Sequence, residues 1–175
     1  ARRQRQMCIR DSGLVEPGMH ASGLSLFGID WSVSLNTVAR VGAGDTICVL
    51  PTSLDVFIGF REPTIYIDNG LKKDGCRYNL VLRHEHQHQQ VSIAALEYFM
   101  PRIRAEIQKA LPVVRPRAVA SLSATDAATE EMNGEYIRLI RPLVNDFKAT
   151  LLYEQKKLDN RENYRFESGV CKGRP

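Results

Sequence analysis

The sequence predicts an α+β fold, in which a small, mostly antiparallel sheet is followed by two long helices that form an antiparallel hairpin. Before about residue 76, short runs of alternating apolar and polar residues are separated by Gly, Pro and Asp turns. After it, apolar residues recur at helical spacing, and Pro112 and Pro116 interrupt the pattern. We therefore expect one domain over residues 13–175, β-rich over 13–75 and helical over 76–175.

The first twelve residues are left out of this prediction. Residues Arg2–Ser12 match the translation of a transposon adapter used to prepare sequencing libraries, so we interpret residues 1–12 as an adapter-derived artefact. They hold four of the 24 Lys and Arg residues and one of the 20 Asp and Glu residues, and without them the net charge falls from +4 to +1. This near-neutral charge disfavours nucleic-acid binding. We expect the native N-terminus, with any signal peptide, to lie outside this sequence.

Alternation at period two predicts a strand over Trp31–Asn36. Strand-like runs near turn signals predict three more: Thr46–Leu50, Leu54–Phe60 and Thr64–Ile67. Pro51 has no backbone N–H, so we expect it to end the second of these strands or to place it at an edge. Only three residues join the last two strands, a link short enough for them to pair with each other in antiparallel fashion.

Two long helices are expected, the first over Tyr78–Ala110 and the second from Ser123, a plausible N-cap, to about Leu158. Pro101 and Pro142 remove one backbone hydrogen bond each, and we expect them to kink or split these helices. The tail after Leu158 reads as irregular. No apolar run approaches the roughly 20 residues needed to span a membrane, so we expect no membrane span in this fragment.

The first helix carries the motif H-E-x-x-H at His84, Glu85 and His88. Residues four apart lie on one face of a helix, so both imidazoles can bind a single Zn²⁺ ion. Glu85 would then act as the general base on zinc-bound water. The alternative is a surface cluster of His and Gln residues that binds metal adventitiously. His86 points elsewhere on the helix, and His20 lies in a Gly- and Ser-rich stretch typical of a surface.

A catalytic zinc ion usually has three protein ligands and one open position. No histidine follows His88, so a carboxylate must complete the set. If residue 110 lies opposite residue 124, the hairpin places the two histidines opposite residues 146–150, with an error of two turns or more. This leaves Asp146, Glu154 and Asp159 as candidates.

Three cysteines remain after the artefact is removed: Cys48, Cys76 and Cys171. Because Cys76 precedes the first helix and Cys171 follows the second, a bridge between them would close the hairpin beside the histidines. Such a disulfide implies an oxidising compartment. A Cys48–Cys76 pair, or three reduced cysteines in a cytosolic protein, are the alternatives that remain open.

The chain resembles a bacterial family of predicted secreted zinc-dependent proteases of unknown substrate, within the broad zincin type. The resemblance rests on His84, Glu85 and His88, on the helix that continues from them, and on Asp159 after the second helix. The family has a small residue before the second histidine and a histidine after the aspartate, where this chain has Gln87 and Tyr164. The resemblance implies a zincin-like fold and Asp159 as the third ligand. Tyr164 could donate a hydrogen bond to the oxyanion of the reaction.

These observations predict a secreted or periplasmic zinc-dependent hydrolase, specifically a metallopeptidase, that acts on a protein or peptide substrate. The edge strand Thr64–Ile67 would align an extended substrate by main-chain pairing. The alternative is a non-catalytic exported metal-binding protein. A third possibility, a binding module that uses the arginines of the helices, is disfavoured because scattered arginines usually form a solvated helix face. Nothing in the sequence specifies an oligomeric state.

Overall fold

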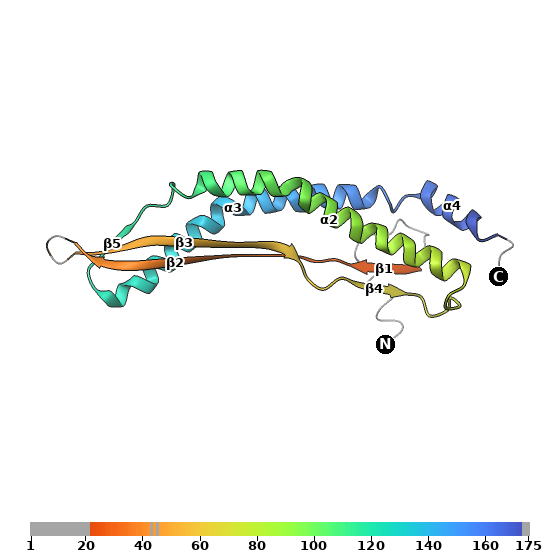
Figure 1. Cartoon of the computed structure of the whole chain (residues 1–175), viewed down its shortest axis with the longest axis horizontal. Helices are drawn as coiled ribbons and strands as arrows, with labels where there is room; N and C mark the ends of the chain where they lie inside the picture. The colour runs from red at the N-terminus through yellow and green to blue at the C-terminus, as the bar shows by residue number, and fades with distance from the viewer. Residues whose placement is uncertain (1–21, 43, 45, 173–175) are drawn as a thin grey trace. The chain divides into compact units, whose positions relative to one another are not determined.

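The computed structural model describes residues 22–42, 44 and 46–172, so the predictions for residues 1–12 and His20 lie outside the described residues. The α+β prediction is confirmed, because small antiparallel sheets precede the long helices (Figure 1). The chain forms two compact units. Of the described residues, the first unit contains 22–28, Arg61–Ala95 and 149–172, and the second contains those of Ile29–Phe60 and Leu96–Lys148.

Each unit combines strands with a segment of both long helices. The division into compact units therefore does not follow the division of the sequence into a β-rich and a helical part. The expectation of a single domain over residues 13–175 stays a prediction.

In the first unit, strand β1 (Gly23–Leu26) pairs with strand β4 (Thr64–Ile67) in antiparallel fashion. The predicted pairing of β4 with the strand before it is wrong. The Arg61 N–H donates to the Gly28 C=O over 3.1 Å, so the chain continues beside the segment that follows β1 and does not fold back. Two short sheets result where one was expected.

In the second unit, strands β2 (Ile29–Val41), β3 (Ile47–Phe60) and β5 (Arg117–Val119) form an antiparallel sheet in the order β2-β3-β5. Two predicted strands are thus one strand, β3, which continues through Pro51. The register shifts there, since Asn36 pairs with Ser53 whereas Thr37 pairs with Pro51. This β-bulge lets a strand include a proline without leaving a ladder hydrogen bond unmade.

Helix α2 (Cys76–Ala110) and helix α3 (Thr125–Lys156) are continuous, so Pro101 and Pro142 split neither of them. A short 3-10 helix, η2 (Leu122–Ala124), precedes α3. The prediction of an irregular tail is wrong, because helix α4 (Arg161–Val170) follows α3. Within the described part of the chain, no helix is both long enough and apolar enough to span a membrane.

Asn160 is the N-cap of helix α4, and its side chain accepts a hydrogen bond from the Asn163 N–H over 2.9 Å. Such a cap satisfies one of the backbone donors left open at the start of a helix. An Asn after a long helix is therefore the signal that could have predicted α4 from the sequence.

Helices α2 and α3 run antiparallel, but their register differs from the prediction. In the second unit, the Tyr136 hydroxyl donates to the Leu111 C=O over 3.0 Å, and the Phe99 and Phe147 rings lie 5.4 Å apart. Leu111 was expected beside residue 123, so the shift is roughly three turns. The first turns of α3 lie beyond the end of α2 and pack on the sheet instead, through Ala128 and Met132.

The core of the second unit forms where α3 covers the three-stranded sheet. Its fully or almost fully buried residues come from β2, β3, the segment before β5 and one face of α3: Val33, Leu35, Val49, Val114, Ala128, Met132, Tyr136, Ile140 and Val144. Burying these side chains contributes about 1.5–3 kcal/mol for each large one.

Replacing Phe147 by alanine should lower the free energy of unfolding by about 3–5 kcal/mol. Phe147 is fully buried and contacts the rings of Phe60 and Phe99, so the change removes apolar contacts and leaves a cavity. The matched control is Phe57→Ala in the same unit, where the side chain is 53% exposed, and it should cost about 1 kcal/mol or less. Chemical denaturation measures both, and equal losses would contradict this description of the core.

Candidate metal centre

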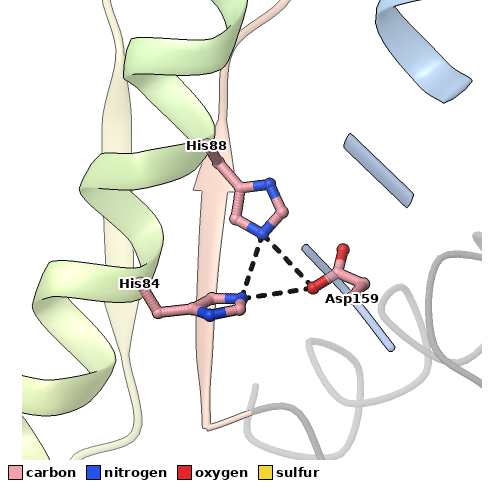
Figure 2. Close-up of side chains that lie close together, drawn as sticks. All are labelled: His84, His88 and Asp159. Atoms are coloured by element: carbon pink, nitrogen blue, oxygen red, sulfur yellow. Dashed lines mark hydrogen bonds and ion pairs between the residues drawn. The ribbon is translucent and has the colours of Figure 1, made fainter. Parts of the chain in front are cut away.

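The histidines of the H-E-x-x-H motif converge on one carboxylate in the first unit. The Nε2 atoms of His84 and His88 lie 3.1 Å apart, and each lies 3.2 Å from Oδ1 of Asp159 (Figure 2). Both histidines project from the same face of α2, one turn apart. Asp159 lies in the short link between α3 and α4, so this link meets α2 at the site.

The three atoms form a triangle whose sides suit a small metal ion. Tetrahedral zinc has Zn–N and Zn–O bonds of about 2.0–2.2 Å, which places neighbouring ligand atoms about 3.3–3.6 Å apart. The sides observed here, 3.1–3.2 Å, are within a few tenths of an ångström of that separation. His84, His88 and Asp159 can therefore hold a metal ion. Three protein ligands would leave one position of a tetrahedral ion open.

Each imidazole is oriented through its other nitrogen. Nδ1 of His84 lies 3.1 Å from Oε1 of Glu167, and Nδ1 of His88 hydrogen-bonds Oε1 of Gln155. Both partners are acceptors, so they keep the proton on Nδ1 and leave the Nε2 lone pair free to face a metal. Metal-binding histidines in proteins are usually held in this way.

Gln155 has its own orientation fixed by the backbone of α2. Its Nε2 donates to the His88 C=O over 2.8 Å and to Oγ of Ser92 over 2.7 Å. Ser92 is buried and donates to the same C=O over 3.0 Å. Because the amide nitrogen is engaged there, the amide oxygen must point at the imidazole.

Tyr164 of α4 holds the carboxylate. Its hydroxyl donates to Oδ1 of Asp159 over 2.7 Å, and its ring centroid lies 5.3 Å from that of His84. The sequence suggested that this hydroxyl could serve the oxyanion of a reaction. In the structure it contacts Asp159 instead, where it fixes the direction of the carboxylate.

Charge in the site favours protons when no metal is bound. Burial is the largest single effect and lowers the pKa of both imidazoles. For His84, the hydrogen bond to Asp159 and the charge and hydrogen bond of Glu167 together exceed this effect and raise the pKa to about 9. For His88, the hydrogen bonds and charge of Asp159 and Gln155 together raise the pKa. Against the opposing effect of burial, the hydrogen bonds from both rings hold the pKa of Asp159 well below its usual range. A metal ion would take the place of these protons.

Glu85 lies beside the ligands but faces strand β1. It is 5% exposed, and this burial raises the pKa of its carboxyl group, which also interacts electrostatically with His84 and His88. The backbone of Ser25 hydrogen-bonds the carboxylate. At Gly23, a Cβ atom would lie only 2.4 Å from Oε1 of Glu85, so the strand can approach this closely only with glycine there.

The other carboxylates that the hairpin estimate left open lie elsewhere. Asp146 belongs to the second unit, where it pairs with Arg102 over 2.8 Å. Glu154 pairs with Lys157 over 2.6 Å and is partly exposed. His86, as expected, is exposed on the opposite side of α2.

Comparisons with protein-family models, with curated proteins and with solved structures found no match to this chain. The interpretation of the site therefore depends on its geometry.

The sequence analysis missed Gln155, Ser92 and Glu167. The sequence offered the Glu154 carboxylate as a candidate ligand, but one residue changes the direction on a helix by about 100°, so Gln155 and not Glu154 faces His88. Glu167 was overlooked because the tail was expected to be irregular. Ser92 follows His88 by one turn on the face that carries both histidines, and this spacing was a usable signal.

The predicted disulfide between Cys76 and Cys171 is confirmed, with their Cα atoms 5.8 Å apart. The alternative pair of Cys48 with Cys76 is therefore wrong. Cys48 lies on β3, in the second unit, and forms no disulfide with a described residue.

Zinc binding should release protons at pH 7 and should become tighter as the pH rises. With a pKa of about 9, His84 is protonated at pH 7 in the metal-free protein, so the ion must displace a proton. The apparent affinity should rise about tenfold per pH unit for each proton released, and should level off above pH 9. Calorimetry in buffers of different ionisation enthalpy counts these protons.

Glu167→Gln on α4 tests this prediction, and Glu162→Gln on the same helix is its matched control. Glu167 contacts His84, whereas Glu162 is exposed. Only Glu167→Gln should reduce the number of protons released at pH 7. An affinity that does not change between pH 7 and pH 9 would contradict the description of the site.

Proposed function

We propose that the protein is a zinc-dependent hydrolase, specifically a metallopeptidase of the zincin type. One observation carries the proposal: the two imidazoles of the H-E-x-x-H motif and Asp159 converge to 3.1–3.2 Å, while Glu85 of the same helix lies buried beside them without belonging to the triangle. Three ligands and a separate carboxylate make up the residue set of a hydrolytic zinc site.

The donor set supports zinc as the metal. Two imidazole nitrogens and one carboxylate oxygen suit zinc and its neighbours in the first transition row, whereas Ca²⁺ and Mg²⁺ prefer oxygen ligands alone. The size of the triangle matches tetrahedral coordination. Among the metals that bind imidazole, zinc combines this geometry with hydrolytic chemistry.

Glu85 would carry the proton transfer. A zinc ion in the site would supply an acidified water and polarise the carbonyl of the substrate. The Glu85 carboxylate would accept a proton from that water and deliver it to the departing amine. Burial raises the pKa of Glu85, which makes its carboxylate a stronger base. Its hydrogen bond with the Ser25 backbone fixes the direction from which it acts.

We propose that strand β1, in place of the β4 strand suggested by the sequence, aligns an extended substrate. The Asp68 N–H donates to the Ser22 C=O, and hydrogen-bonded pairs alternate along antiparallel strands. Gly23 and Ser25 therefore direct their backbone groups away from β4, which agrees with the contact between Ser25 and Glu85. An extended peptide paired with this edge would lie beside the general base.

The second candidate function, a non-catalytic exported metal-binding protein, is favoured by the burial of the site. His84 is 4% exposed and Glu85 is 5% exposed, which is unusual for groups that must meet a macromolecular substrate. For either function we propose a secreted or periplasmic location, and the Cys76–Cys171 disulfide supports it because disulfides persist in oxidising compartments.

Replacing Glu85 by glutamine should abolish hydrolysis and leave zinc binding intact. The amide keeps the shape of the side chain but cannot accept the proton, and a general base contributes about 10²–10⁴-fold to the rate. Hydrolysis of an unfolded protein substrate and metal content are measured on the same preparation, with Glu97→Gln, an exposed change on α2, as the control. His88→Ala should lose both zinc and activity.

These measurements separate the two candidate functions. Full activity in Glu85→Gln would exclude Glu85 as the base. A wild-type protein that holds one zinc ion per chain but cleaves no protein or peptide substrate would favour the metal-binding function.

Replacing Gly23 by alanine should lower activity by about 10²-fold while the zinc content stays unchanged. The new methyl group would lie 2.4 Å from Oε1 of Glu85 and 2.6 Å from Val81, so the carboxylate must move, and a displacement of about 1 Å can have an effect of this size. The control is Gly28→Ala, where a Cβ atom meets nothing within 4 Å. Equal activity in the two variants would show that β1 does not position Glu85.

A further inference from the structure

Helix α4 lies over the metal site although none of its residues is fully buried. Phe166, its largest apolar side chain, is 73% exposed. A helix of ten residues is unstable by itself in water, so its contacts must hold it in place. Hydrophobic burial, which normally provides most of this stabilisation, contributes little here.

The contacts that do hold α4 lie on one of its faces. Tyr164, Glu167 and Cys171 are spaced at i, i+3 and i+7, which places all three on the same side of the helix. Tyr164 donates to Asp159, Glu167 contacts His84, and Cys171 is bonded to Cys76. Two of these three contacts orient metal ligands, and the third is the disulfide.

The disulfide joins the end of α4 to the first residue of α2. Cys76 precedes His84 by eight residues of the same helix, a rise of about 12 Å. Glu167 precedes Cys171 by four residues, about one turn. The covalent bond therefore fixes both helices on the side of the site where Glu167 meets the imidazole.

We propose that Tyr164 and Glu167 are positioning residues of the metal centre, and that the Cys76–Cys171 disulfide holds them there, so that tight metal binding requires oxidation of the two cysteines. This inference rests on the metal centre of the proposed function and does not depend on hydrolysis. Removal of groups that orient metal ligands typically weakens metal binding 10- to 100-fold. The reduced protein should lose this factor, because α4 is then free to leave its place.

The chemistry of the switch is thiol–disulfide exchange. The two Sγ–H groups give up two protons and two electrons to the disulfide of another molecule, such as oxidised glutathione, which becomes two thiols. One S–S bond forms in the protein and one breaks in the oxidant. In a reducing compartment the reverse reaction frees α4, so the metal centre would become competent only after the chain reaches an oxidising one.

The test compares the zinc affinity of the wild type with that of the double variant Cys76→Ser, Cys171→Ser, by competition with a chelator. Serine prevents the freed thiols from binding zinc themselves. The double variant should bind 10- to 100-fold more weakly, while the control Cys48→Ser should bind like the wild type. Circular dichroism checks that the long helices remain folded. Equal affinity in the double variant and the wild type would overturn the inference.

A second pair of changes tests whether the disulfide acts through α4. In the oxidised wild type, Tyr164→Phe with Glu167→Gln should weaken zinc binding 10- to 100-fold. The same pair should add little in the Cys76→Ser, Cys171→Ser background, because the two side chains are already displaced there. Additive losses would overturn the inference.

The same pair keeps the inference testable if the serine variant does not fold. An unchanged affinity in the oxidised protein with both α4 substitutions would then overturn it. Failure of the metal centre itself is distinguishable, since the wild type would then bind no stoichiometric zinc. Failure of the hydrolase proposal alone would leave every one of these affinities unaffected.

Discussion

The contacts that arrange the candidate metal site of the first unit converge on one oxygen atom, Oδ1 of Asp159. It accepts from the Tyr164 hydroxyl at 2.7 Å and lies 3.2 Å from Nε2 of both His84 and His88. These three hydrogen-bond contacts keep the Asp159 carboxylate ionised, and an ionised carboxylate oxygen is a site where a cation would be stabilised. Because Asp159 lies directly after α3, the end of that helix has to be placed accurately, and Gln155, one turn before it, is fixed to the backbone of α2.

The parts of the site that the sequence predicted well are those that depend on local spacing. Two histidines four residues apart share a helix face whatever the rest of the chain does. The disulfide was predictable because an antiparallel hairpin brings its two ends together, and this remains true when the register of the helices is wrong. The α+β order follows in the same way from two different periodicities in one chain.

The third ligand depends on register, and geometry alone did not identify it. The link between the helices contains β5 and η2, and the first turns of α3 pack on the sheet, so α3 is displaced by roughly three turns from a simple hairpin. Helix α4 is short, mostly polar and has no buried residue, so no apolar stripe marks a face that packs on a core. The sequence did not predict that a strand continues through Pro51, because the bulge there depends on pairing with β2. It did not predict the partner of β4, because that partner, β1, is distant in the sequence.

Glu85 is the residue that distinguishes an enzyme from a metal-binding protein. Burying a carboxylate is costly unless it is paired, and Glu85 is buried although it is not one of the three residues of the ligand triangle. Here the cost is met by the Ser25 backbone and by a strand that carries glycine where a side chain would displace the carboxylate. Because this local structure serves the direction of the carboxylate and not the ligand triangle, it favours proton transfer as the role of Glu85.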